Sequence, residues 1–120
     1  MATIDSLQER YQEFVAKRDW EQFHTPKNLS EAISIESGEL LETFLWHDNY
    51  DADSISEDPD LTQKVEEELA DIVIYSLALS SQLEIDLIDA VEEKMEQNEE
   101  RFDMETSEEM TENLKNWKRS

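Results

Sequence analysis

Near the middle of the chain, two acidic residues stand directly against an apolar run: Glu68-Leu69-Ala70-Asp71-Ile72-Val73-Ile74-Tyr75. From Leu69 to Leu79 the sequence is apolar almost all round, which predicts a central, buried helix. Asp60 is the expected cap, and the helix should run from about Leu61 to Gln82. The 120 residues include one glycine and two prolines, and the apolar residues follow helical spacing. The predicted fold class is therefore all-α.

The sequence on either side of this helix predicts further helices. The expected elements are a helix over residues 4 to 18, an ordered aromatic loop over 19 to 28, a helix from Leu29 (capped by Asn28) to about His47, a polar connector over 48 to 60, and a helix from Leu87 (capped by Asp86) to about Arg101. We expect one domain over residues 1–102. The tail over residues 103–120 could form a short extra helix capped by Thr106 and Glu109 and reaching Trp117.

Composition narrows the functional classes. The net charge is −22, from 10 basic and 32 acidic residues, and nucleic-acid binding proteins need basic patches that this chain lacks. There is no cysteine, which excludes disulfides, thiolate nucleophiles and cysteine-bound zinc. Neither a signal peptide nor an apolar run long enough to span a membrane is apparent. We expect a cytoplasmic protein without nucleic-acid or membrane partners.

Two acidic pairs are candidates for a metal site. Glu36 and Glu39 are three residues apart, as are Glu68 and Asp71, and that spacing puts both carboxylates of a pair on one helix face. If the two helices face each other, four carboxylates share one small volume and repel one another unless a divalent cation is present. Oxygen ligands suit Mg²⁺, or Mn²⁺ in its place. Because such pairs also arise by chance in so acidic a chain, a solvated acidic seam is the alternative.

Aromatic and polar residues outside these pairs are candidates for substrate binding. Trp20, His24 and Trp46 could fill a core or stack on a nucleobase. Lys94 and Asn98 could belong to a surface stripe or contact phosphates. No glycine-rich phosphate loop, serine elbow or HExxH motif is present. Catalysis would therefore use metal-activated water rather than a covalent intermediate.

Four stretches of the sequence, taken together, resemble a known family. They are Arg18-Asp19-Trp20-Glu21-Gln22-Phe23-His24 with Pro26, Asn28 and Leu29; Glu36-x-Gly38-Glu39-Leu40 with Trp46; Glu68-Leu69-x-Asp71-Ile72-x-Ile74-Tyr75; and Lys94-Met95 with Asn98 and Arg101. In this order they resemble the MazG-like all-α nucleoside triphosphate pyrophosphohydrolases, most closely the dCTP pyrophosphatase branch. The resemblance covers about residues 5 to 102.

The resemblance implies a four-helix bundle assembled as a dimer or a dimer of dimers, with active sites close to the subunit contacts. It also implies cleavage of a nucleoside triphosphate between the α and β phosphorus atoms. Carried over by motif, the Mg²⁺ ligands would be Glu36, Glu39, Glu68 and Asp71. A glutamate, Glu39 or Glu36, would activate the attacking water. Substrate would be bound by Trp20, His24, Trp46, Tyr75, Lys94 and Asn98.

Two alternatives stay open at this point. One keeps the metal site but changes the substrate to another phosphoanhydride metabolite. The other is an acidic helical module that binds a basic partner and performs no chemistry. The charge suits such a module, whereas the apolar surroundings of Asp71 and the aromatic string from Trp20 to Leu29 do not.

Overall fold

A computed structural model describes residues 1–46 and 51–119, and every regular element in those ranges is helical. The elements are α1 (Ile4–Lys17), the 3₁₀ turn η1 (Glu21–Phe23), α2 (Pro26–Thr43), α3 (Ala52–Ser56), α4 (Pro59–Gln82), α5 (Leu87–Arg101) and α6 (Met104–Arg119). The predicted all-α class is confirmed. The chain divides into two compact units, Met1–Ile85 and Asp86–Ser120, and the predicted domain boundary after residue 102 stays a prediction.

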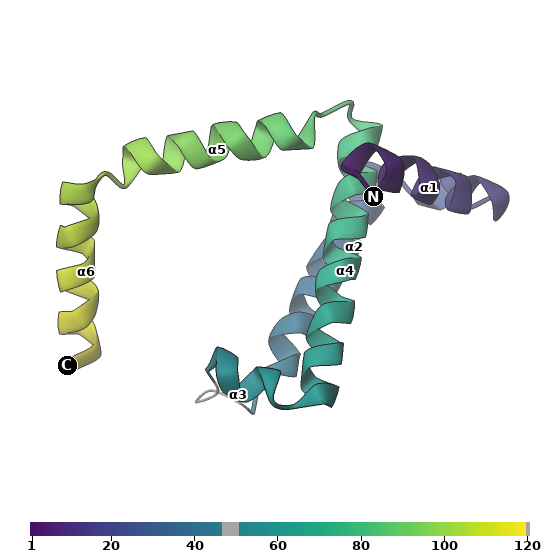
Figure 1. Ribbon diagram of the computed structural model, residues 1–120. Helices are drawn as coiled ribbons and strands as arrows, with labels where there is room; N and C mark the ends of the chain where they lie inside the picture. Colours follow the sequence, from purple (N-terminus) through teal and green to yellow (C-terminus); the bar gives the residue numbers. More distant parts are fainter. Residues whose placement is uncertain (47–50, 120) are drawn as a thin grey trace. The chain divides into compact units, whose positions relative to one another are not determined.

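The first unit is organised around α4. Helices α2 and α4 lie side by side, and α1 packs against the carboxyl-terminal part of α4 (Figure 1). Among the described residues, the buried apolar side chains are Val15 on α1, Leu29 on α2 and Leu77 on α4. Each of the three helices thus contributes one buried apolar residue to a small core.

The predicted central position of α4 is confirmed, but in the single chain the middle of this helix is buried only in part. Leu69 is 48% exposed and Val73 is 52% exposed. Within the first unit, α1, α2 and α3 are the elements that pack on α4, and they cover only part of its circumference. An apolar strip on α4 therefore remains open to solvent.

Two helices begin earlier than predicted, in both cases because a proline occupies the first turn. Thr25, not Asn28, caps α2: its hydroxyl accepts a hydrogen bond from the Asn28 amide at 3.2 Å. Asp58, not Asp60, caps α4 by accepting from the Leu61 amide at 3.2 Å. Proline is well suited to the first helical position because it has no amide hydrogen to leave unpaired.

Two helices are followed by a non-glycine residue whose backbone lies in the left-handed region. Asp19, after α1, has φ 55°, and Glu84, after α4, has φ 54°. In each case the amide of the next residue donates a hydrogen bond to a carbonyl of the helix. Trp20 donates to Val15 at 3.0 Å, and Ile85 donates to Ser80 at 2.9 Å. This is the hydrogen-bond pattern of a Schellman C-cap. At α1 it turns the chain sharply and starts the aromatic segment at Trp20.

The predicted connector over residues 48 to 60 contains the short helix α3, capped by Asp51. Residues 47–50, at which the second predicted helix was expected to end and the connector to begin, lie outside the described residues.

The second unit consists of α5 and α6. The predicted cap of α5 is confirmed, since Asp86 accepts from the Asp89 amide at 3.1 Å. The extra helix in the tail is longer than predicted and starts at Met104, because Asp103 rather than Thr106 accepts at its first turn. Within the described residues, no helix is long and apolar enough to cross a membrane.

Candidate functional site

Three carboxylates from α2 and α4 meet in one cluster, which we call the acid cluster: Glu36, Glu39 and Glu68. Glu36 and Glu39 lie on one face of α2 because they are one turn apart, and this face packs against α4. One carboxylate oxygen from each residue lies within 4.8 Å of the others. Glu68 is only 3% exposed, and Glu36 and Glu39 are half-buried.

The acid cluster is short of hydrogen-bond donors and cations. Glu68 Oε1 lies 2.8 Å from the ammonium nitrogen of Lys64, one turn earlier on α4. The other oxygen of Glu68 and Oε2 of Glu36 are buried and have no hydrogen-bond partner. A buried carboxylate oxygen without a partner is costly unless a cation is nearby.

Neighbouring groups shift the pKa values of two carboxyl groups in the acid cluster in opposite directions. The Glu68 carboxyl, to which a protonated Glu36 could donate, raises the pKa of Glu36 to about 7, aided by burial and by Glu39. The Lys64 ammonium, together with contact with Glu36, holds the pKa of Glu68 below its usual value. One site therefore contains an easily protonated carboxyl next to one that stays ionised.

The donor set of the acid cluster fits a hard divalent cation. All the ligand atoms are carboxylate oxygens, as Mg²⁺ and Mn²⁺ prefer. Glu36 and Glu68 also each carry a buried oxygen without a hydrogen-bond partner, which a bound cation would offset. We conclude that the acid cluster is a candidate metal centre.

Asp71, the fourth predicted ligand, is not part of this group. It lies one turn beyond Glu68 on α4 and is half-buried, whereas the sequence pointed to Asp71 as the buried carboxylate. Burial, followed by the negative charge of Asp71, raises the pKa of Tyr75, and Asp71 also contributes to the raised pKa of Tyr11. Its role as a metal ligand stays a prediction.

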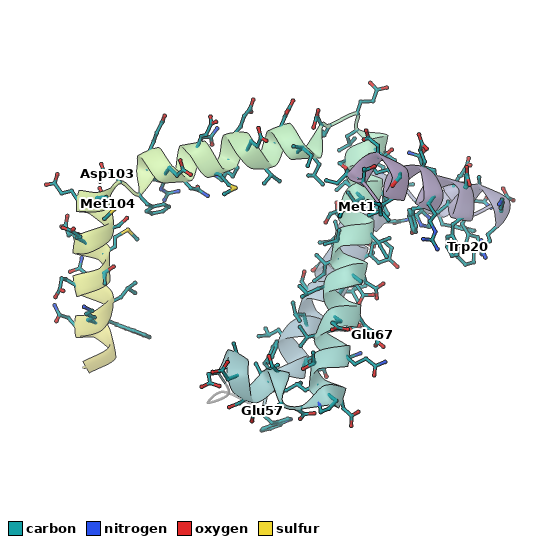
Figure 2. The ribbon with its side chains drawn as sticks, in the orientation of Figure 1. Met1, Trp20, Glu57, Glu67, Asp103 and Met104 are labelled. Atoms are coloured by element: carbon teal, nitrogen blue, oxygen red, sulfur yellow. The ribbon has the colours of Figure 1, made fainter. Side chains whose placement is uncertain are left out.

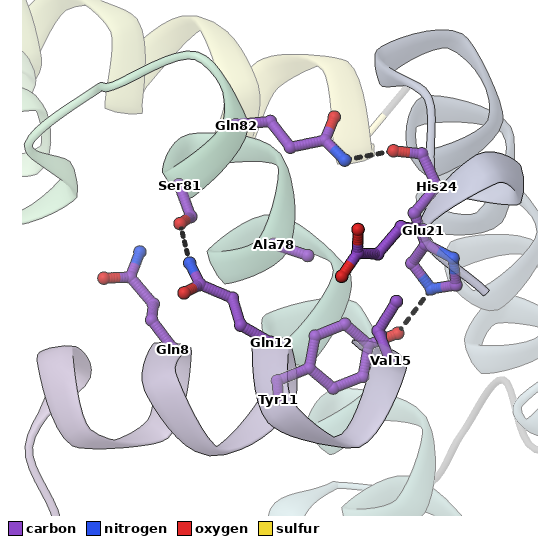
Figure 3. A pocket seen from close by; sticks show the side chains of 9 residues that line it. All are labelled: Gln8, Tyr11, Gln12, Val15, Glu21, His24, Ala78, Ser81 and Gln82. Atoms are coloured by element: carbon purple, nitrogen blue, oxygen red, sulfur yellow. Dashed lines mark hydrogen bonds between the residues drawn. The ribbon is translucent and has the colours of Figure 1, made fainter. Parts of the chain in front are cut away.

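A pocket of about 380 Å³ adjoins α1, the segment around η1 and the carboxyl-terminal part of α4 (Figure 3). Its lining residues are Gln8, Tyr11, Gln12, Val15, Glu21, His24, Ala78, Ser81 and Gln82. Of the predicted substrate-binding residues, His24 is the one among them. We call this cavity the His24 pocket.

Hydrogen bonds fix the orientation of the His24 ring. Its Nδ1 lies 3.0 Å from the Trp20 carbonyl oxygen, and its Nε2 lies 2.9 Å from the Tyr11 hydroxyl (Figure 3). A carbonyl can only accept, so Nδ1 carries a proton, and in the neutral form of the ring Nε2 accepts from Tyr11. The ring is therefore held in one tautomer, with both nitrogens engaged.

Three glutamines tie the walls of the His24 pocket together. Gln8 Nε2 donates to the Leu77 carbonyl and to the Ser80 hydroxyl, each at 3.1 Å. Gln12 donates to the Ser81 hydroxyl, and Gln82 donates to the His24 carbonyl (Figure 3). The amides connect α1 and the His24 segment to α4, so they hold the pocket in shape.

The other predicted substrate residues do not line this pocket. Trp20 lies just beyond the end of α1 (Figure 2), with its ring edge-on to Phe14. Trp46 is 87% exposed, and Tyr75 lies on α4 one turn after Asp71. Lys94 and Asn98 are exposed on α5, in the second unit.

Sequence reasoning missed Tyr11, the glutamines and Lys64. Gln8, Tyr11, Gln12 and Val15 have the spacing of one helix face. Of these four, the apolar pattern of the first helix includes Tyr11 and Val15 but neither glutamine. Lys64 precedes Glu68 by four residues, a spacing that favours an ion pair. That pairing became informative only when Glu68 proved to be buried.

Comparisons with known proteins agree with this architecture. The model of the MazG-like family matches residues 32–117. The chain is 38% identical over 105 residues to dCTP pyrophosphatase 1 of Mus musculus, covering 88% of this chain and 62% of that protein. It is 39% identical over 100 residues to dCTP pyrophosphatase 1 of Homo sapiens, covering 83% of this chain and 59% of that protein.

A crystal structure of a pyrophosphatase from Archaeoglobus fulgidus DSM 4304 superposes with a TM-score of 0.74 at 41% identity, covering 86% of this chain and 94% of that chain. The chain belongs to the MazG-like family. It spans about 62% of the length of the curated mouse relative that it matches.

Proposed function

We propose that this protein is a Mg²⁺-dependent nucleoside triphosphate pyrophosphohydrolase, with dCTP as its preferred substrate. It would cleave a (d)NTP to the monophosphate and pyrophosphate, for control or cleansing of the nucleotide pool. The observation that carries the proposal is the acid cluster, whose buried oxygens on Glu36 and Glu68 have no partner. The names of its relatives, dCTP pyrophosphatase 1 and a pyrophosphatase, support this choice of substrate class.

In the proposed reaction, the acid cluster supplies the ligands and a base. Glu36, Glu39 and Glu68 would hold the cation, joined by Asp71 when it binds. The cation would offset the triphosphate charge and lower the pKa of water. Glu39, or Glu36, would accept the proton of the attacking water, whose oxygen bonds to a phosphorus of the α–β anhydride. The bond from that phosphorus to the bridging oxygen would then break, and the products are the monophosphate and pyrophosphate.

The His24 pocket would receive the base and sugar. The pocket and the acid cluster lie at different positions along α4. Glu68 and Ala78 are ten residues apart, which corresponds to about 15 Å of helix at 1.5 Å per residue. Asp71 and Tyr75 lie between them on the same helix. We assign Trp20, Trp46 and Tyr75 to the base and sugar, and Lys94 and Asn98 to the phosphates or the base edge.

The Tyr11–His24 hydrogen bond offers a test of the His24 pocket. Because Tyr11→Phe removes the donor to His24 Nε2 but keeps the ring, we expect a KM for dCTP raised about fivefold, the size of one neutral hydrogen bond. The ¹⁵N shift of His24 Nε2 should move in the same variant. A moved ¹⁵N shift with unchanged KM would exclude the His24 pocket as the base site.

Assembly as a homodimer or dimer of dimers is part of the proposal. Leu69 and Val73 on α4, and Ile88, Val91 and Met95 on α5, are each about half exposed, and a second copy of the chain would cover them. We expect Val73→Asp to shift the mass measured by light scattering towards the monomer. A wild-type monomer at micromolar concentration would contradict this part of the proposal.

The deciding experiment measures pyrophosphate release from each of the four dNTPs, with Mg²⁺ and with EDTA. Mg²⁺-dependent release with a monophosphate product is expected, fastest with dCTP. No release from any dNTP would overturn the assignment in favour of another phosphoanhydride or of an acidic interaction module. The burial of Glu68 disfavours that module, whose acids would lie on the surface. Cytoplasmic location and the absence of nucleic-acid and membrane partners stay predictions.

A further inference from the structure

Lys64 makes an ion pair in which the two side chains differ greatly in exposure. The Lys64 side chain is 51% exposed, whereas that of its partner Glu68 is only 4% exposed. The pair joins Nζ to Oε1 at 2.8 Å, between residues one turn apart on α4. The ammonium thus lies at the boundary between the buried acid cluster and solvent.

On its solvent side, Lys64 lines an open acidic depression of about 630 Å³. The depression is lined by Glu39, Glu42, Thr43, Asp58, Asp60, Leu61 and Lys64. An ammonium that left Glu68 would therefore remain hydrated and among negative charges.

We propose that Lys64 is the internal counter-ion of the acid cluster: it holds Glu68 in the metal-free protein and competes with the divalent cation for the Glu68 carboxylate. This inference rests on the metal centre proposed above. It assigns to Lys64 a positioning role and not a step in hydrolysis.

The Lys64 ammonium balances only part of the negative charge that is buried in the acid cluster. A buried carboxylate needs a cation, and Lys64 provides one at a single oxygen of Glu68. The second oxygen of Glu68 and Oε2 of Glu36 remain unpartnered. A divalent cation reaches several carboxylates at once, which an ammonium at the edge does not do.

Releasing Glu68 when a divalent cation binds would cost Lys64 little free energy. Lysine carries a compact charge on a flexible apolar stem, so the charged end can move while the stem stays packed. Since about half of the side chain is already exposed, its release buries no new charge. Metal binding would thus replace the Lys64–Glu68 ion pair without rearranging the helices.

The test measures Mn²⁺ binding to full-length wild-type protein and Lys64→Met by electron paramagnetic resonance of the free ion. Because the variant loses both the competitor and a nearby positive charge, we expect Mn²⁺ to bind about tenfold more tightly. In EDTA its Tm should fall, since Glu68 loses its counter-ion, and the rise in Tm on adding Mn²⁺ should exceed that of wild type.

Three further variants make the result specific. Lys64→Arg keeps the charge and should restore wild-type affinity. Lys64→Gln keeps a donor without the charge and should tighten binding as Lys64→Met does, which keeps the test usable if Lys64→Met fails to fold. Lys115→Met removes the ammonium of an exposed pair with Glu112 and should leave Mn²⁺ binding and Tm unchanged.

The outcomes separate this inference from the proposed function. If wild-type protein does not bind Mn²⁺, the metal centre is wrong and the inference falls with it. If wild-type protein binds but the neutral Lys64 variants bind equally or more weakly, the inference alone is overturned. Tighter binding by both neutral variants, with Lys64→Arg like wild type, supports it.

Discussion

Glutamates three residues apart occur both in the acid cluster and on α5, with different consequences. Glu93, Glu96 and Glu99 repeat the spacing of Glu36 and Glu39, yet all three are exposed. Glu36 and Glu39 instead meet Glu68 from a second helix. Identical local spacing therefore gives a solvated face in one region and a charge-crowded site in the other. The decisive difference is a second acidic helix packed against the first.

The two ion pairs of the described residues differ in the same way. Lys64 and Glu68 are 2.8 Å apart with the carboxylate buried, whereas Lys115 and Glu112 are 3.7 Å apart with both side chains largely exposed. Exposed ion pairs contribute little to the stability of the fold, because water and salt screen them. A buried carboxylate depends on its cation far more strongly.

The largest expected effect is loss of catalysis when a carboxylate of the acid cluster is neutralised. Glu39→Gln should lower kcat for dCTP about a thousandfold, the range expected for loss of a general base, with helicity by circular dichroism unchanged. Glu96→Gln on α5 is the matched control and should keep full activity. Normal turnover of Glu39→Gln at saturating Mg²⁺ would break the contrast between the two regions.

Asp71→Asn sharpens the boundary of the site. If Asp71 joins the three clustered carboxylates when the cation binds, the Mg²⁺ concentration for half-maximal activity should rise by one to two orders of magnitude, about 1.4 kcal/mol for each tenfold change. Titration of activity with Mg²⁺ measures it directly. An unchanged half-saturation point would restrict the site to Glu36, Glu39 and Glu68.

The third prediction uses pH to compare the metal-free acid cluster with an ordinary carboxylate. The pKa of Glu36 is raised to about 7 from an ordinary value of 4.5, so folding favours its protonated form. That contribution to stability is complete below pH 4.5 and is lost as the pH rises through about 7. In EDTA, Glu36→Gln should therefore become progressively more stable than wild type between pH 5 and pH 8.

Thermal unfolding at several pH values provides the measurement, with Glu99→Gln as the control that removes an exposed charge. A difference between Glu36→Gln and wild type that does not depend on pH would show that the Glu36 carboxyl is not crowded by its neighbours.

The smallest effect is expected at the exposed ion pair. Glu112→Gln removes the partner of Lys115 and should leave Tm unchanged within error, because the pair is solvated. Glu68→Gln, by contrast, should change the Tm of the metal-free protein measurably. Equal shifts in the two variants would show that burial does not distinguish these ion pairs.

Much of the fold followed from local sequence. Helical apolar spacing predicted α1, α2, α4 and α5, and Asp86 was correctly identified as a cap. The starts of α2 and α4 were misplaced because Asn28 and Asp60 resemble caps. Pro26 and Pro59 at the first helical position move the caps to the residues before them. The preference of proline for the first helical position predicts where both helices begin.

The four predicted metal ligands stay a prediction, and the structure brings only part of the set together. Glu36, Glu39 and Glu68 converge as predicted, but Asp71 does not join them. The apolar sequence around Asp71 suggested that it was the buried acid, whereas packing of α2 against α4 buries Glu68 instead. Which side of an apolar helix its neighbours cover depends on those neighbours, and the sequence of α4 alone does not contain that information.

The helical class and the pairing of acids one turn apart follow from the sequence, because both depend on the geometry of a single helix. Helix packing instead determines which acids meet, that the carboxylate next to Lys64 is buried, and that the Tyr11 hydroxyl reaches His24. These contacts depend on burial and on the packing of separate helices. Burial is what turns an ordinary carboxylate into a candidate ligand, since it removes the water that would otherwise satisfy the charge.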